Sequence, residues 1–289
     1  MRTSHSNLAG SAAAATALSL WLVLAFGATA HAYSQKAVER LAADNACTGC
    51  DLIRADLANA DLAGADLRAA DLRSAILEKA SLRGAKLGGA NLSGANAEKA
   101  DLSSADVTRA DMRWIDLEKA LLIDAALTGS DLSGADLGGA KLTGAKLAGA
   151  NMEYVDLNRA DLTGALLTDV NLNRAKLKRA NLAGATLVNA VLERANLERA
   201  NLQDAQLKGA NLTAANLARA DLAGANLQDA TLKDASLQRA NLAGAQLVGA
   251  DLSGASFRLA TGLTQAQLDT ACGSVTTALP EGLTIANCE

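Results

Sequence analysis

A five-residue repeat runs through most of this chain and limits what the chain can fold into. A leucine or another apolar residue recurs every five positions from Leu52 to Phe257 without a break in phase, which gives 42 units. An alanine precedes almost every one of them by two positions, usually with Asp or Asn between, as in "ANLERANL". A period of five fits neither the α-helix nor the β-strand. The chain therefore needs a backbone that turns a corner in every unit.

Each pentapeptide is predicted to form one short extended side and one corner. Two side chains separated by two positions point to the same side of an extended segment, so the alanine and the leucine face inward. The other positions hold mostly Gly, Ser, Thr or charged residues, which suit a turn. Stacked coils would pair their backbones at about 4.8 Å per coil. Columns of Asn and Asp would then form ladders on the outside.

The A(D/N)Lxx pattern of residues 50–260 resembles that of the pentapeptide-repeat proteins. The resemblance implies an all-β solenoid, a right-handed quadrilateral β-helix with four pentapeptides per coil and residues n and n+20 stacked. The 42 units would then make about 10.5 coils and a rod about 50 Å long.

Short helical caps are expected at both ends of the rod, because an open stack of strands exposes unpaired backbone. Residues 33–49 are predicted to form the N-terminal cap, a helix with Ser34 as N-cap and with Val38, Leu41 and Ala42 buried.

Residues 261–289 are predicted to form a helix followed by an irregular arm closed by a disulfide. Thr264 and Gln267 have the spacing of a capping box, and Leu263 and Leu268 that of a hydrophobic staple. Gly273 is expected to end this helix.

The first 32 residues have the layout of a secretory signal peptide. Arg2 gives a positive start, "AAAATALSLWLVLAFGATA" is uncharged and apolar, and Ala30 and Ala32 are small residues at a cleavage site. Cleavage is expected before Tyr33, which gives a periplasmic or secreted protein without a membrane span. The alternative is an uncleaved anchor, because the apolar run is nearly long enough to span a bilayer.

Four cysteines are expected to form one disulfide at each end of the rod. Cys47 and Cys50 lie at its start, and Cys272 and Cys288 follow its last repeat. Disulfide-bonded Cα atoms lie within about 7 Å, so a rod of about 50 Å between the pairs leaves only Cys47–Cys50 and Cys272–Cys288 within one chain. The CxxC spacing also occurs in redox and metal sites. No βαβ setting, second ligand pair or histidine after Cys50 supports those readings.

No catalytic site, cofactor or metal is expected. Both histidines, His5 and His31, lie in the signal peptide, so the mature chain lacks the commonest general base and transition-metal ligand. The carboxylates repeat at one consensus position, whereas acid–base catalysis needs carboxyl groups in contrasting environments. The glycines lie at repeat corners rather than opening a helix as in a phosphate loop. The sequence therefore predicts a non-enzymatic protein.

Two non-enzymatic functions remain. The first is an exported structural or binding rod of the cell envelope, with another protein or an anionic envelope polymer as partner. The second follows from the resemblance, because some pentapeptide-repeat proteins are acidic, DNA-mimicking modulators of a type II topoisomerase (gyrase). That role is cytoplasmic and needs a dense acidic face, whereas this chain carries a signal peptide and a net charge of only −4. Nucleic acid is not an expected partner, and the oligomeric state stays open.

A ladder of arginines is predicted on one face of the rod. These residues are 20 positions apart, so a four-sided coil would stack them in one column about 20 Å long. Its members are Arg159, Arg179, Arg199, Arg219 and Arg239, and Lys178 lies beside them. Three lysines continue the column towards the N-terminus, each next to a neutralising glutamate: Lys79, Lys99 and Lys119, beside Glu78, Glu98 and Glu118.

The five arginines and Lys178 are the candidate anion-binding residues. Like charges this close repel one another, and arginine suits phosphate or carboxylate, such as the phosphates of lipopolysaccharide. The alternative is a solvated face whose aliphatic stems cover the coils, with counter-charge from adjoining faces.

Trp114, Gly134 and Tyr154 are also spaced by 20 residues and should lie in one column. Two aromatic walls about 9–10 Å apart over a glycine floor could hold a flat ring or the face of a sugar. The alternative is two isolated surface aromatics, which need no explanation.

Overall fold

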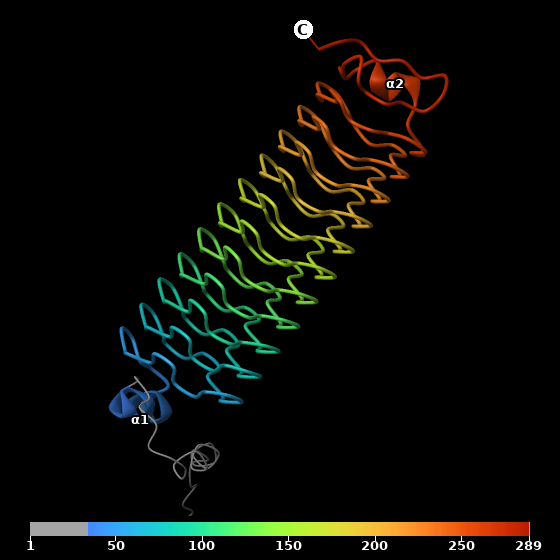
Figure 1. The fold of residues 1–289 in the computed structure, drawn as a ribbon. Helices are drawn as coiled ribbons and strands as arrows, with labels where there is room; N and C mark the ends of the chain where they lie inside the picture. The colour runs from blue at the N-terminus through green and yellow to red at the C-terminus, as the bar shows by residue number, and fades with distance from the viewer. Residues whose placement is uncertain (1–33, 289) are drawn as a thin grey trace, which may run out of the picture. The chain divides into compact units, whose positions relative to one another are not determined.

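Residues 34–288 are described in a computed structural model, and most of them wind as a regular coil between two short helices (Figure 1). Helix α1 spans Gln35–Asp44 and helix α2 spans Gln265–Leu268. The predicted signal peptide lies outside the described residues. Among the residues that are described, no helix has the length and apolar character needed to cross a membrane.

The coil repeats every 20 residues. Single parallel β-bridges join residue n to residue n+20, from Ala46 and Asp66 at the start to Asn241 and Thr261 near the end. Because 20 residues hold four pentapeptides, the predicted stacking of n on n+20 is confirmed. Each side contributes one bridge residue, so between the helices the sheet consists of isolated bridges instead of long strands.

Every corner has the same backbone conformation. The Leu52 carbonyl accepts a hydrogen bond from the Ala55 amide at 3.0 Å, which closes a turn over the two residues between them. The second of these, Arg54, has φ of 58°, and the equivalent residue of every later pentapeptide also has positive φ. Such a position favours glycine, yet arginine, lysine and aspartate often occupy it here. This corner residue points outward and sets the surface of the rod.

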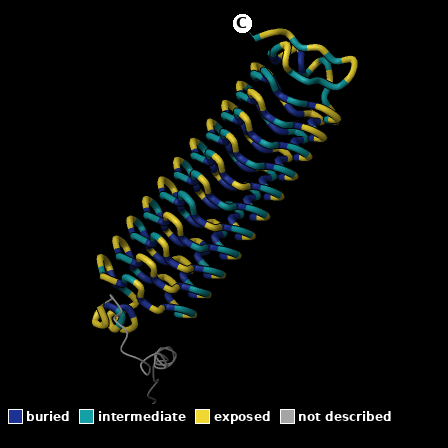
Figure 2. Tube along the Cα trace, in the orientation of Figure 1, coloured by how far each residue is buried: buried dark blue, intermediate teal, exposed yellow. Residues whose placement is uncertain are grey.

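The core is a narrow column of Leu and Ala side chains. In Figure 2 the buried residues line the inside of each coil and the exposed ones lie at its corners. Leu52, Ala55 and most of their equivalents along the coil are almost fully buried, as predicted, whereas Ala60 and Ala260 near the two ends are partly buried. Where a larger residue such as Ile115 replaces the alanine, it is buried as well.

The Asp or Asn before each core leucine stabilises the turn that follows. The Asp51 carboxylate, for example, accepts a hydrogen bond from the Ile53 amide at 3.2 Å, the local bond that makes these residues common in turns. Asparagines also bond from coil to coil: Asn171 donates to Asn151 at 3.0 Å. The predicted polar ladders therefore form where asparagine supplies a donor.

Helix α1 begins as predicted and buries a slightly different face. The Ser34 side chain accepts a hydrogen bond from the Ala37 amide at 3.3 Å. Ala37 and Leu41 are buried against the core and Val38 is partly buried. Ala42 is exposed, so its predicted burial was wrong. Ala37 and Leu41 are four residues apart and share one side of the helix, whereas Ala42 points away.

Helix α2 has the predicted capping box but ends early. The Gln267 side-chain oxygen accepts a hydrogen bond from the Thr264 amide at 2.7 Å, and the Thr264 hydroxyl accepts one from the Gln267 amide at 3.4 Å. The helix ends at Leu268, so the prediction that Gly273 ends it was wrong. Gly273 instead pairs with Asn287 of the C-terminal arm. A Cβ on Gly273 would stand 3.0 Å from Cγ2 of Ile285, which explains the small residue there.

Coil-like pairing continues beyond α2. Asp251 pairs with Cys272 and Ser256 with Ala278, in the same parallel sense as the repeats. The spacing grows from 20 to 21 and 22 residues because the chain accommodates α2 on the way. The C-terminal arm then packs Leu279, Leu283 and Ile285 against the core.

Candidate anion-binding face

The five predicted ladder arginines occupy the same corner of five successive coils. Each is the second turn residue of its pentapeptide and has φ of 60–61°. Backbone hydrogen bonds hold the coils in register, such as Arg159 amide to Lys178 carbonyl and Arg179 amide to Glu198 carbonyl, both 3.0 Å. We call this column and the residues immediately before it the arginine face.

The lysines below the arginines are neutralised by their neighbours. Lys79 lies 2.6 Å from Glu78, and Lys99 lies 2.6 Å from Glu98. Lys119 pairs with Glu118 in the same way. The hydrogen bond from Lys99 lowers the pKa of the Glu98 carboxyl, and the charges of the lysines one coil above and below lower it further. This part of the column is therefore a closed network of alternating charges.

The candidate residues above the lysines divide into paired and unpaired groups. Lys178 lies 2.8 Å from the Glu198 carboxylate, and Arg199 lies 3.7 Å from it. The hydrogen bond from Lys178 is the main reason that the pKa of Glu198 is lowered. Four ladder arginines make no ion pair with a carboxylate of residues 34–288: Arg159, Arg179, Arg219 and Arg239.

Arginines elsewhere on the rod show that pairing is available to this side chain. Arg68 lies 2.5 Å from Asp66, Arg73 lies 2.6 Å from Asp71, and Arg113 lies 2.7 Å from Asp111. In each case the aspartate is two positions earlier in the same turn. The hydrogen bond from Arg113 lowers the pKa of the Asp111 carboxyl. The ladder arginines sit one position further along, beyond this local partner.

Two hollows lie on the arginine face. The larger, about 450 Å³, forms where Gly138 and Gly139 interrupt the column between Lys119 and Arg159. Three carboxylates line it together with the cations: Glu118, Asp136 and Asp156. The smaller, about 320 Å³, lies further along and is lined by Ala218, Arg219, Gln238, Arg239, Arg258 and Leu259. Its charged lining groups are all arginines.

Arg258 and Ala218 escaped the candidate set drawn from the sequence. Both lie at the first turn position, which precedes the ladder column, and Arg258 follows Gln238 by one coil of 20 residues. The 20-residue spacing alone already places both in this neighbouring column, with Ala218 where Glu198 stands one coil earlier. Neither was counted as an anion-binding candidate, because the spacing does not show that a hollow forms there.

The predicted aromatic notch is not open. Trp114, Gly134 and Tyr154 share a corner column, but the indole itself lies on the glycine floor: a Cβ on Gly134 would stand 2.8 Å from Cη2 of Trp114. The Tyr154 hydroxyl accepts a hydrogen bond of 2.8 Å from Arg174, whose guanidinium is 5.5 Å from the ring centroid. The indole fills the space that a bound ring would need, because a glycine lets it fold over the next coil.

The structure contains both predicted disulfides. Cys47 is bonded to Cys50, with the Cα atoms 5.3 Å apart, and Cys272 to Cys288, with the Cα atoms 4.8 Å apart. Among residues 34–288 no cysteine is free. The first bond lies next to α1 and the second ties the C-terminal arm to the last paired segment of the coil.

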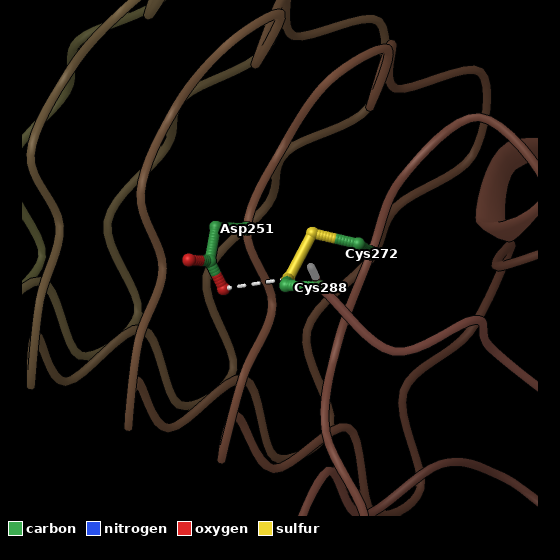
Figure 3. Close-up of side chains that lie close together, drawn as sticks. All are labelled: Asp251, Cys272 and Cys288. Carbon is green, nitrogen blue, oxygen red and sulfur yellow. Dashed lines mark hydrogen bonds between the residues drawn. A yellow bond between two sulfur atoms is a disulfide. The ribbon is translucent and has the colours of Figure 1, made fainter.

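One cluster near the second disulfide has the spacing of a metal site. Asp251, Cys272 and Cys288 lie close together (Figure 3), with the Asp251 carboxylate 3.3 Å from the Cys288 sulfur. A cysteine binds a metal ion as a thiolate, whereas both sulfurs here belong to a disulfide. Burial raises the pKa of the Asp251 carboxyl, but hydrogen bonds from Ser253 and Lys233 outweigh this effect and lower it. The cluster therefore offers one carboxylate, which is not a ligand set.

The repeats match a family model. The model described as pentapeptide repeats matches in eight copies, which together cover residues 50–213 and 215–254. The comparison with curated proteins finds no significant match.

Solved structures with the same repeat resemble this chain. HetL, a pentapeptide repeat protein involved in heterocyst differentiation regulation from the cyanobacterium Nostoc sp. strain PCC 7120, is 34% identical, with a TM-score of 0.70 over 81% of this chain and 99% of HetL. QnrB1, a plasmid-mediated fluoroquinolone resistance protein, is 17% identical, with a TM-score of 0.37 over 73% of this chain and 90% of QnrB1. A pentapeptide repeat protein from the Arabidopsis thaliana thylakoid lumen is 29% identical, with a TM-score of 0.18 over 38% and 70%.

The likenesses to QnrB1 and to the Arabidopsis protein are too distant to inform function. The family model and the likeness to HetL rest on the same residues that build the coil. The chain therefore belongs to the pentapeptide repeat family, whose members fold as right-handed quadrilateral β-helices.

Proposed function

We propose that this protein is a non-enzymatic, exported binding rod of the cell envelope whose arginine face holds an anionic ligand or partner. The observation that carries the proposal is the set of four ladder arginines without a carboxylate partner among residues 34–288. Elsewhere on the same rod, Arg68, Arg73 and Arg113 pair with an aspartate in their own turn. Three other corner arginines, Arg54, Arg109 and Arg174, form no ion pair with a carboxylate of residues 34–288 either. A column of unpaired guanidinium groups suits phosphate or carboxylate groups, which accept paired hydrogen bonds.

Two observations support export of the protein, and a third supports the proposal that the two ends of the rod are covered. Residues 1–32 have the three regions of a signal peptide with cleavage before Tyr33. The two disulfides suit an oxidising compartment such as the periplasm or the exterior. Helices and arms that pack on the terminal coils would cover the unpaired backbone there. The partner would be another protein or an anionic polymer of the envelope.

The charge arrangement disfavours the alternative, a DNA-mimicking modulator of gyrase. A DNA mimic needs a continuous acidic face, whereas on this rod many aspartates are engaged by arginines or turn amides. An assay of DNA supercoiling by gyrase with the purified mature protein separates the two functions. Inhibition or drug protection at stoichiometric protein would favour the mimic and contradict our proposal.

Substitution of the ladder tests the proposed face. Arg179, Arg199 and Arg219 are each replaced by Gln, and retention on heparin and lipopolysaccharide matrices is compared across a salt gradient. The native protein should elute at higher salt than the variant, because three guanidinium contacts are lost.

A matched triple variant controls for net charge. Arg68→Gln, Arg73→Gln and Arg113→Gln remove the same number of charges from arginines that are already paired with aspartates. Retention of this control should stay close to native. Equal losses in both variants would mean that net charge, not the ladder, governs retention and would refute the proposed face.

Export is tested separately. Fractionation of cells and N-terminal sequencing of the mature protein should find it outside the cytoplasm, beginning at Tyr33. A cytoplasmic protein that retains residues 1–32 would contradict this part of the proposal.

A further inference from the structure

The smaller hollow on the arginine face is built from three successive coils. The Arg219 amide donates to the Gln238 carbonyl at 2.8 Å, and the Arg239 amide donates to the Arg258 carbonyl at 3.0 Å. These bonds fix the backbones that carry its lining, so the hollow of about 320 Å³ belongs to the rigid coil. It is not formed by a loop.

The lining of this hollow carries positive charge alone. Arg219, Arg239 and Arg258 are its charged groups, and none of them forms an ion pair with a carboxylate of residues 34–288. The larger hollow differs, because Glu118, Asp136 and Asp156 share its walls with the cations. Three guanidinium groups without an ion pair surround one space and repel one another within a Debye length of about 8 Å. The Glu198 carboxylate one coil earlier attracts Arg219 but does not line the hollow. An anion in that space would remove the repulsion.

Ala218 creates both the space and the charge imbalance. The equivalent position one coil earlier holds Glu198, and three coils nearer the N-terminus also hold glutamate there: Glu78, Glu98 and Glu118. The Ala218 amide donates to the Asn216 side chain at 3.1 Å, as the Glu198 amide donates to Asn196 at 3.1 Å. Because both turns have this bond, the two coils differ at this position in the side chain, and Ala218 lines the hollow without the carboxylate that Glu198 carries.

We propose that this hollow binds the phosphate group of a phosphomonoester, an inference that rests on the anion-binding function proposed above. A phosphomonoester carries a charge of about −1.5 to −2 at neutral pH and three acceptor oxygens. It therefore matches the three guanidinium forks better than a single carboxylate does. The Gln238 amide can bond a neighbouring hydroxyl. Leu259, which is 68% exposed, gives the rim an apolar contact.

Two sources carry this chemistry, a phosphorylated sugar and a phospholipid headgroup. Glucose 6-phosphate probes the first by titration calorimetry, with glucose as the uncharged control. Vesicles containing phosphatidic acid probe the second by sedimentation, with phosphatidylcholine vesicles as the control. Leu259→Ser should weaken binding to the vesicles alone if the ligand is a lipid, since the apolar rim would then contact acyl chains. If Leu259→Ser and the native protein bind the phosphatidic acid vesicles with equal affinity, the site is assigned to the soluble phosphomonoester.

The decisive variant is Ala218→Glu. It places a carboxylate beside Arg219 in a turn that already holds glutamate in four other coils, so the fold should persist. Affinity for the phosphomonoester probe should fall at least tenfold. The matched control is Ala183→Glu, which adds the same charge at the same turn position on another face, where the amide also donates to an asparagine, Asn181. The affinity of Ala183→Glu for the phosphomonoester probe should stay within about twofold of the native value.

A second variant separates this inference from the proposed function. Arg159→Gln with Arg179→Gln removes ladder arginines that do not line the hollow. Heparin retention should fall while glucose 6-phosphate binding persists. Native-like phosphomonoester binding by Ala218→Glu, or binding by the native protein to neither probe, overturns the phosphate site. Heparin retention that depends on the ladder would still support the proposed function in either case.

Discussion

The indole of Trp114 lies across Gly134, the residue directly above it one coil further along. A Cβ on Gly134 would stand 2.8 Å from Cη2 of the indole and overlap two other ring atoms. Corner side chains elsewhere lean the same way: Cγ of Lys119 would lie 3.7 Å from a Cβ on Gly139, and Cγ of Asp204 3.3 Å from one on Gly224. A glycine at the corner position thus gives room to the side chain of the preceding coil.

Gly134→Ala should displace Trp114 and destabilise the rod. The new methyl group would overlap the indole, and the alanine would be held at φ of 68°. Trp114 is the sole tryptophan of a chain that begins at Tyr33, so its fluorescence emission reports the displacement directly. The control is Gly184→Ala, at φ of 63° with nothing within 4 Å of the added atom. Unchanged emission in Gly134→Ala would contradict the packing.

Gly262→Ala should be among the most destabilising alanine substitutions at a glycine. The added Cβ would stand 2.5 Å from the backbone nitrogen of Ala243, which cannot move without disturbing the coil. We expect a loss of about 2–4 kcal/mol from overpacking and backbone strain together. Gly244→Ala has a similar φ of 69° but open space, so it should lose about 1 kcal/mol. Chemical denaturation measures both, and equal losses would refute the steric argument.

Arg219→Gly should stabilise the fold while it weakens anion binding. Arg219 is held at φ of 61°, a conformation that costs a non-glycine residue about 1 kcal/mol or more. Removing its charge also reduces repulsion with Arg239 and Arg258. Arg258→Gly is the control, because Arg258 is not at positive φ. Thermal unfolding at low salt should rise for Arg219→Gly relative to this control. A lower melting temperature for Arg219→Gly would contradict the prediction.

The lysine–glutamate part of the column should contribute stability that is lost in acid. The pKa of Glu98 is lowered in the folded protein, first by the hydrogen bond from Lys99. A carboxyl group with a lowered folded pKa stabilises the fold above its ordinary pKa, and that contribution disappears as the pH falls through the folded value. Glu98→Gln should therefore show a weaker decline of melting temperature below about pH 4 than the native protein. Parallel declines in the two proteins would exclude this contribution.

The repeat made several elements of the fold predictable. The burial of Leu52 and Ala55 and the Ser34 cap follow from short segments whose preferences act locally. The stacking of Ala46 on Asp66 was predicted from the resemblance to the pentapeptide-repeat proteins, since a period of five does not give the number of sides in a coil. The end of α2 was not predictable in this way. Cys272 and Ala278 pair with the last coil instead of continuing the helix. The stability gained from these pairs depends on residues 21 and 22 positions away, which local preferences do not reveal.

The candidate site was predicted in register but not in detail. The 20-residue spacing placed Arg159 and Arg179 in one column, since one coil holds four pentapeptides. It did not show that Lys178 and Arg199 share Glu198. Nor did it show that Trp114 covers Gly134.

The sequence by itself determined that the chain turns a corner in every unit and that each corner residue points outward, because every pentapeptide repeats the same local pattern of Ala, Leu and turn. The register of four units per coil followed from the resemblance to the pentapeptide-repeat proteins. Only the tertiary structure decided which outward side chains are paired and where hollows remain. Coils lie about 4.8 Å apart, and an arginine or lysine side chain is long enough to reach its own turn or the next coil. Its partner is therefore chosen in three dimensions, by whichever carboxylate or open space the stacked coils bring within reach.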